Sequence, residues 1–157
     1  MAESLTATLD LPDARATEAL GQQLARHLPE DTRGFMILLE GELGSGKSTL
    51  ARAMLRALGH RGPVPSPTYT LVEPYTIGGR TVYHVDLYRL TDGGELPYLG
   101  WTEMDDGLML VEWPERAPSL AARGDLIVRL RYLGTGRAAE VVAQSPRGRA
   151  LLRPVMS

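Results

Sequence analysis

The order of apolar and polar positions predicts alternating strands and helices. Continuous apolar runs at residues 35–39 and 108–111 are typical of strands that are covered on both faces. Leucines recur every four residues from 20 to 28, as on the buried side of an amphipathic helix that starts near residues 10–13 and ends before Pro29. Further strands are predicted at residues 5–9, 69–75, 81–88, 126–130 and 138–143.

A glycine-rich loop at residues 41–46 separates the first apolar strand from a second amphipathic helix, which Gly59 ends. Strand, loop and helix in this order begin a parallel α/β unit. The last two strands flank a turn at residues 134–136 and predict a hairpin. We therefore predict one α/β domain over residues 1–157, with a central, mostly parallel sheet, few helices, a C-terminal β-hairpin and a loose tail at 145–157.

The loop itself carries a phosphate-binding motif. The segment Gly41-Glu42-Leu43-Gly44-Ser45-Gly46-Lys47-Ser48 fits the pattern G-x-x-x-x-G-K-[ST] at every specified position. Glycines let successive backbone N–H groups point at phosphate oxygens, and the helix N-terminus adds its partial positive charge. These residues predict a P-loop NTPase-like fold that binds the phosphates of a ligand. A glycine-rich turn without a ligand is the alternative.

The mechanism of such a loop predicts roles for three side chains. We expect Lys47 to reach the β- and γ-phosphates and the Ser48 hydroxyl to bind Mg²⁺. Thr49 either contacts the α-phosphate or is an ordinary residue of the first helical turn. Lys47 is the one lysine among 17 basic residues, which indicates a position that requires a slim ammonium group.

A magnesium ion also needs carboxylate oxygens. Glu112 directly follows the apolar run at 108–111, and Asp86 lies within the strand predicted at 81–88. A carboxylate in so apolar a strand is unfavourable unless it is paired or bound to a metal. Either residue fits the metal site, and a salt-bridged strand-end residue is the alternative for both.

Composition excludes several other functions. The chain has no cysteine, so disulfides, thiol nucleophiles and cysteine-bound metals are ruled out. No apolar run approaches the length of a membrane span, and the first residues do not resemble a secretory signal, so we expect a cytoplasmic protein without a membrane partner. Net charge is −2 overall, with −7 over residues 1–122 and +5 over 123–157. The basic last quarter either faces an acidic partner or is simply solvated.

Three further segments, together with the loop, resemble one family. They are Ser66-Pro67-Thr68-Tyr69, His84-Val85-Asp86-Leu87-Tyr88-Arg89-Leu90 and Glu112-Trp113-Pro114-Glu115. In this order and spacing the chain is similar to the TsaE/YjeE family, the bacterial tRNA threonylcarbamoyladenosine biosynthesis ATPase, over about residues 8–143.

The resemblance implies a function and partners. The protein would bind ATP with Mg²⁺ and hydrolyse it slowly to ADP and phosphate. It would act with TsaB and TsaD homologues, which form N6-threonylcarbamoyladenosine at position 37 of tRNAs that read ANN codons. It would meet tRNA only through that complex.

The resemblance also implies roles for single residues. Ser48 and Glu112 would bind the metal, and Asp86 would be a catalytic or metal-organising carboxylate. Thr68 would contact the γ-phosphate from a switch-like loop. By the same resemblance, Trp113 would lie beside the nucleotide, and Asp13 and Arg137 would approach adenine and ribose.

Two other classes remain open from the residues alone. A small-molecule P-loop kinase shares the loop but needs an arginine-bearing lid and an acceptor pocket, for which this chain has little room. A nucleotide-gated binding module would not depend on hydrolysis. Direct tRNA binding through the basic last quarter lacks an interleaved aromatic platform.

Overall fold

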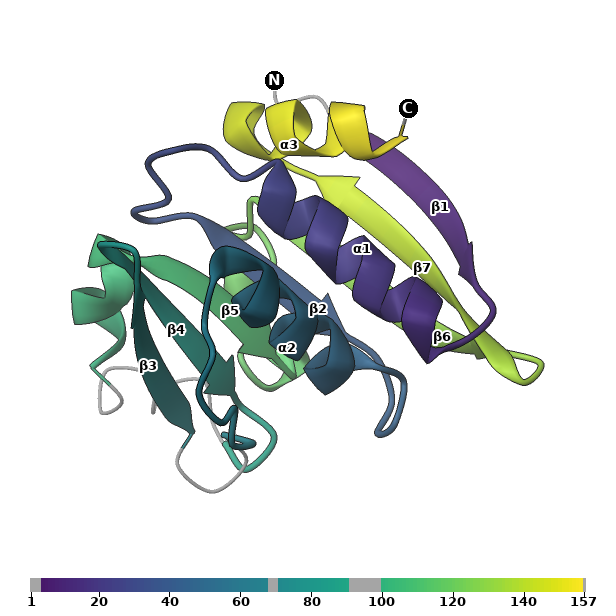
Figure 1. Ribbon diagram of the computed structural model, residues 1–157, viewed down its shortest axis with the longest axis horizontal. Helices are drawn as coiled ribbons and strands as arrows, with labels where there is room; N and C mark the ends of the chain where they lie inside the picture. The colour runs from purple at the N-terminus through teal and green to yellow at the C-terminus, as the bar shows by residue number, and fades with distance from the viewer. Residues whose placement is uncertain (1–3, 68–70, 91–99, 157) are drawn as a thin grey trace.

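One seven-stranded sheet organises the chain, and its strands follow the order β1-β7-β6-β2-β5-β4-β3 (Figure 1). The computed structural model describes residues 4–67, 71–90 and 100–156. The strands are β1 (Leu5–Leu11), β2 (Met36–Glu40), β3 (Val72–Ile77), β4 (Arg80–Asp86), β5 (Leu108–Glu112), β6 (Leu126–Leu133) and β7 (Gly136–Ala143).

Strand direction confirms the predicted sheet. The four central strands β6, β2, β5 and β4 pair in parallel, while β1 and β3 at the edges and β7 pair antiparallel with their neighbours. Strands β6 and β7 form the predicted C-terminal hairpin. Parallel strands end at the same edge of a sheet, so the segments that follow β2, β4 and β5 emerge side by side.

Helices α1 (Ala14–Arg26) and α2 (Lys47–Leu58) lie together on one face of the sheet (Figure 1). Asp13 begins α1 as its N-cap, because its Oδ1 accepts a hydrogen bond of 2.9 Å from the N–H of Ala16. Buried residues of both helices, such as Leu24 and Leu50, join one hydrophobic core with the facing side of the sheet.

The opposite face is covered by short 3-10 helices, η2 (Trp101–Asp106), η3 (Pro114–Arg116) and η4 (Pro118–Leu120). Alternate residues of β2 therefore enter different cores: Ile37 packs on the helical side and Leu38 on the 3-10 side. This two-sided burial explains why the strand reads as a continuous apolar run.

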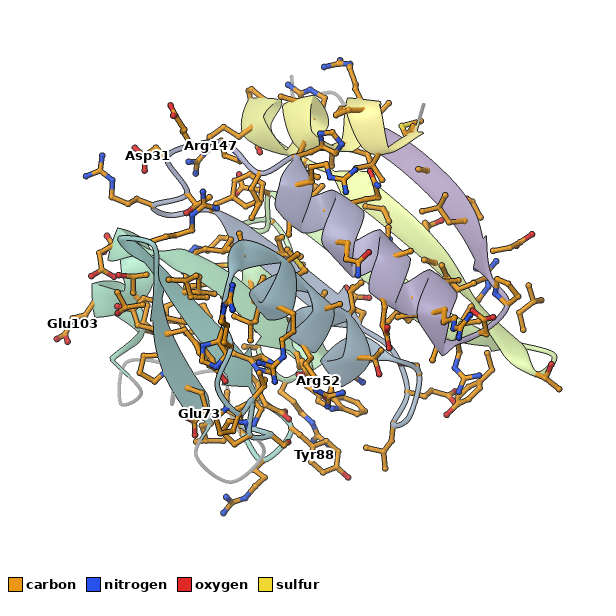
Figure 2. The ribbon with its side chains drawn as sticks, in the orientation of Figure 1. Asp31, Arg52, Glu73, Tyr88, Glu103 and Arg147 are labelled. Atoms are coloured by element: carbon orange, nitrogen blue, oxygen red, sulfur yellow. The ribbon has the colours of Figure 1, made fainter. Side chains whose placement is uncertain are left out.

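The prediction of a loose tail at 145–157 is wrong. Residues Pro146–Met156 form helix α3, and Leu151 and Leu152 are buried in the core. Pro146 suits the first helical position, where no intrahelical N–H bond is needed. The Arg147 guanidinium donates 3.2 Å hydrogen bonds to the backbone carbonyls of Asp31 and Arg33, which ties α3 to the loop before β2 (Figure 2).

None of the helices in the described ranges combines the length and apolar composition that a membrane span requires.

Substitution of single side chains by alanine tests whether α3 packs in the core. Leu152→Ala should lower the free energy of unfolding by about 2–5 kcal/mol, because a fully buried leucine leaves a cavity. Met156→Ala, on the same helix but 45% exposed, is the control and should have little effect. Urea unfolding of both variants measures the difference. Equal and small losses would show that α3 is not packed.

Candidate nucleotide site

Glycines shape the loop between β2 and α2. Gly41, Gly44 and Gly46 have φ angles of +151°, +79° and +111°, which disfavour residues with a Cβ. A Cβ on Gly41 would also lie 2.6 Å from the carbonyl oxygen of Leu130. Gly46 is the N-cap of α2 and provides no side-chain cap, so the first amides of the helix are left for another acceptor. These amides are the donors that an anion at the helix N-terminus would meet.

Lys47 is buried and folded back over its own loop. Its Nζ donates to the carbonyl of Gly41 and, at 3.3 Å, to that of Glu42. The same ammonium lies 3.8 Å from the centre of the Trp113 ring, a cation–π contact. Burial lowers the pKa of Lys47, and the nearby carboxylates of Glu112, Glu115 and Asp86 oppose that shift. A phosphate anion beside this buried ammonium would stabilise its charged form.

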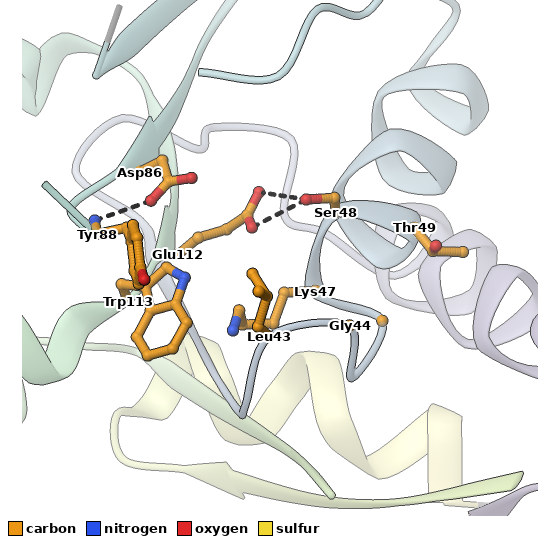
Figure 3. Close-up of a pocket in the computed structure, with 10 residues that line it drawn as sticks. Leu43, Gly44, Lys47, Ser48, Thr49, Asp86, Tyr88, Glu112 and Trp113 are labelled. Carbon is orange, nitrogen blue, oxygen red and sulfur yellow. Dashed lines mark hydrogen bonds between the residues drawn. The ribbon is translucent and has the colours of Figure 1, made fainter. Parts of the chain in front are cut away.

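Ser48 and Glu112 meet across the gap between α2 and β5 (Figure 3). The Ser48 Oγ lies 3.0 and 3.3 Å from the two carboxylate oxygens of Glu112. Glu112 is 2% exposed, and its Oε2 is also 2.5 Å from the Nε2 of His84 on β4. The carboxylate thus accepts hydrogen bonds from two sides.

Asp86 ends β4 directly beside Glu112, its partner in the parallel pairing of β4 with β5. Its side chain is buried, and Oδ1 accepts a 2.9 Å hydrogen bond from the N–H of Tyr88 (Figure 3). This bond turns the chain out of the strand. The structure therefore places both candidate carboxylates, Asp86 and Glu112, beside the loop.

A pocket of about 240 Å³ opens between the loop and these strand ends. It contains Lys47, Ser48, Asp86, Glu112 and Trp113, all of which the sequence singled out, with Gly44, Gly46, Leu43 and Thr49 of the loop and helix start. Tyr88 also lines it, its ring 4.9 Å from that of Trp113. Sequence reasoning missed Tyr88, although it stands two residues after Asp86 in a segment already singled out.

A second pocket of about 170 Å³ lies on the other side of the loop and shares Gly44, Gly46 and Thr49 with the first. Asp13 and Arg137, the two residues that the family resemblance places near adenine and ribose, lie 124 positions apart in the chain and both line this pocket. The Arg137 guanidinium donates to the carbonyl of Gly44 at 3.1 Å and stacks 4.1 Å from the ring centre of Tyr132.

The remaining predicted residues have other positions. Gly41 and Glu42 line a separate groove with Trp113 and Tyr132, while Glu42 contributes its carbonyl to Lys47. Ser45 is buried within the loop and also lines the second pocket. Thr68, predicted to contact the γ-phosphate, lies outside the described residues.

The donor set fits Mg²⁺ as a phosphate loop uses it. Such a site takes one hydroxyl and one or two carboxylates from the protein, while phosphates and waters supply the other oxygens. Ser48 and Glu112 already lie within hydrogen-bond distance, and Asp86 is the neighbour of Glu112 in the sheet. Over residues 4–67, 71–90 and 100–156, no group of three or more acidic or histidine side chains is arranged to bind a metal ion.

Parallel strands, the glycine loop and the carboxylates at the strand ends define an α/β protein of the P-loop NTPase-like class. The family model for the threonylcarbamoyl adenosine biosynthesis protein TsaE matches residues 11–139. The chain belongs to the TsaE family, and the resemblance seen in its sequence is confirmed.

Two relatives carry the name tRNA threonylcarbamoyladenosine biosynthesis protein TsaE. The one from Haemophilus influenzae is 39% identical over 154 residues, which cover 96% of each chain. The one from Synechocystis is 45% identical over 119 residues, 72% of this chain and 73% of the relative. The crystal structure of Bacillus subtilis YdiB has the same fold, with a TM-score of 0.75 at 24% identity over 99% of this chain and 95% of that one.

The pKa of Lys47 predicts a pH dependence of stability. Its pKa is lowered in the folded protein from the usual 10.5, so between the two values the unfolded chain binds more protons and stability increases with pH. The free energy of unfolding of the native protein, relative to Lys47→Met, should therefore rise as the pH approaches 10.5 from below. Chemical denaturation over that range measures it. Parallel curves for the two proteins would contradict the buried ammonium.

Proposed function

We propose that this protein is the ATP-binding and slowly ATP-hydrolysing subunit of the machinery that forms N6-threonylcarbamoyladenosine at position 37 of tRNAs reading ANN codons. Membership of the TsaE family supports the pathway, since two relatives bear its name. One observation supports the chemistry: residues of the glycine-rich loop, Lys47, Ser48 and Glu112 line a single pocket. We place the protein in the cytoplasm, with no membrane partner.

Lys47 and the N–H groups of residues 41–48 hold the β- and γ-phosphates in this proposal. Binding would draw the Lys47 ammonium from the carbonyls of Gly41 and Glu42 onto phosphate oxygens, which are stronger acceptors. The nucleoside would cross the loop into the second pocket, beside Asp13 and Arg137.

Ser48 and Glu112 would hold Mg²⁺, and Asp86 would lie next to this site as the neighbour of Glu112 in the sheet. The ion supplies charge that offsets the negative charge developing on the phosphate oxygens. Both oxygens of Glu112 already accept hydrogen bonds from Ser48 or His84. We therefore assign Asp86 to orient the attacking water, the role that a carboxylate near the γ-phosphate performs in related hydrolases.

The pocket explains why hydrolysis by the chain alone would be slow. Its described lining has one cation, Lys47, and no arginine. An arginine finger contributes about 10³–10⁵ in kcat in P-loop hydrolases and is often supplied by another protein. We propose that TsaB and TsaD homologues complete or reorganise the site, and that tRNA reaches this subunit only through them.

Phosphate release from ATP tests the proposal directly. The isolated protein should turn over slowly in the presence of Mg²⁺, and addition of the TsaB and TsaD homologues should raise the rate by about tenfold or more. Lys47→Ala should abolish the activity in both conditions. Fast turnover that the partners do not change would contradict partner dependence.

The same assay separates the two rival functions. A small-molecule kinase would consume ATP without releasing free phosphate until an acceptor is added. In a binding module that does not depend on hydrolysis, Asp86→Asn would leave both ATP affinity and biological activity intact. If hydrolysis is the function, the variant should retain ATP affinity but lose about 10²-fold or more in the rate of phosphate release.

A further inference from the structure

His84 is buried beside the proposed metal site without a place in the chemistry described so far. It lies on β4, two residues before Asp86, and is 2% exposed. Its Nε2 is 2.5 Å from the Oε2 of Glu112, the shortest side-chain contact that Glu112 makes in the described structure. Burial of an imidazole is unfavourable unless its nitrogens have partners.

The contact determines where the imidazole carries its proton. An ionised carboxylate only accepts hydrogen bonds, so the Nε2 of His84 must donate to Glu112. The other ring nitrogen, Nδ1, is buried and has no hydrogen-bond partner among the described residues.

Packing alone does not explain this residue. A methionine or leucine would fill the same volume and would leave no buried nitrogen without a partner. The polar ring is useful for the hydrogen bond to Glu112.

Glu112 is held from both sides as a result. Ser48, at the start of α2, binds one carboxylate oxygen at 3.0 Å, and His84 on β4 binds the other at 2.5 Å. A glutamate has three rotatable bonds, and two donors at opposite oxygens fix the plane of its carboxylate.

We propose that His84 is a positioning residue. It holds the carboxylate of Glu112 in the orientation that presents Oε1 to Ser48 and to the divalent cation. Its contribution is to couple cation binding to nucleotide binding, not to contact either ligand. This inference rests on the proposed function, because it needs a cation at Ser48 and Glu112.

ATP affinity with and without magnesium tests the inference. It is measured by calorimetry in excess Mg²⁺ and in EDTA, for the wild type and for His84→Met and His84→Gln. Methionine fills the space without a donor, and the glutamine amide can reach Glu112 with an N–H group at about the place of Nε2.

The expected pattern is specific. His84→Met should lose about 10- to 100-fold of the affinity gained from Mg²⁺, the usual effect of removing the partner of a metal ligand, and should match the wild type in EDTA. His84→Gln should keep most of the gain. His60→Met is the matched control, since His60 also has a hydrogen-bonded Nε2, to Pro63 at 3.0 Å, but lies away from the site. It should leave the magnesium gain intact.

Three results would overturn the inference. They are an unchanged magnesium gain in His84→Met, an equal loss of affinity in Mg²⁺ and EDTA, which indicates a merely structural role, and a failure of glutamine to rescue. If the wild type binds ATP without any gain from Mg²⁺, the metal site itself is wrong and the inference fails with it. If the wild type does not bind ATP, the proposed function fails.

A second measurement does not depend on the folding of any variant. Nitrogen-15 NMR of the histidine-labelled wild type shows whether each ring nitrogen carries a hydrogen. We expect a hydrogen on the Nε2 of His84, and an Nε2 without one would overturn the proposal.

Discussion

Parallel pairing of β2, β5 and β4 is the constraint on which the site depends. It aligns Leu39 with Glu112 and Asp86 with Glu112, so both carboxylates and the loop that follows β2 emerge at one edge of the sheet. A shift of one residue in β5 would turn Glu112 to the opposite face and break its contact with Ser48. The two-sided apolar core fixes this register, because each slip would expose buried side chains.

The site gathers four buried ionisable side chains. Lys47, Asp86, His84 and Glu112 are each no more than 5% exposed. Glu112 has two donors, and Lys47 has two carbonyls and the face of Trp113. Burial of such a cluster is unfavourable unless its polar groups are paired and hydrogen-bonded. A phosphate group would stabilise the ammonium, and a divalent cation would stabilise the carboxylates. A nucleotide bound together with its cation would therefore pair with both kinds of group.

Local sequence patterns predicted what depends on local chemistry. The loop motif, the start of a helix near residues 10–13 and the two-sided strands were predicted, because glycine angles, helix-start signals and apolar periodicity act over a few residues. Helix α3 was missed because Pro146, Pro154 and three arginines between 146 and 157 obscure a short apolar stripe. Contacts such as that of Tyr132 with Leu43, 89 residues apart, depend on how the hairpin folds onto the loop, which no local pattern records.

Equilibrium dialysis of the purified protein against ATP and Mg²⁺ tests the central claim most directly, since it asks only whether the loop holds a triphosphate. The account predicts saturable retention of about one nucleotide per chain, lost in Lys47→Ala. No retention by the native protein, or equal retention by the variant, would contradict it.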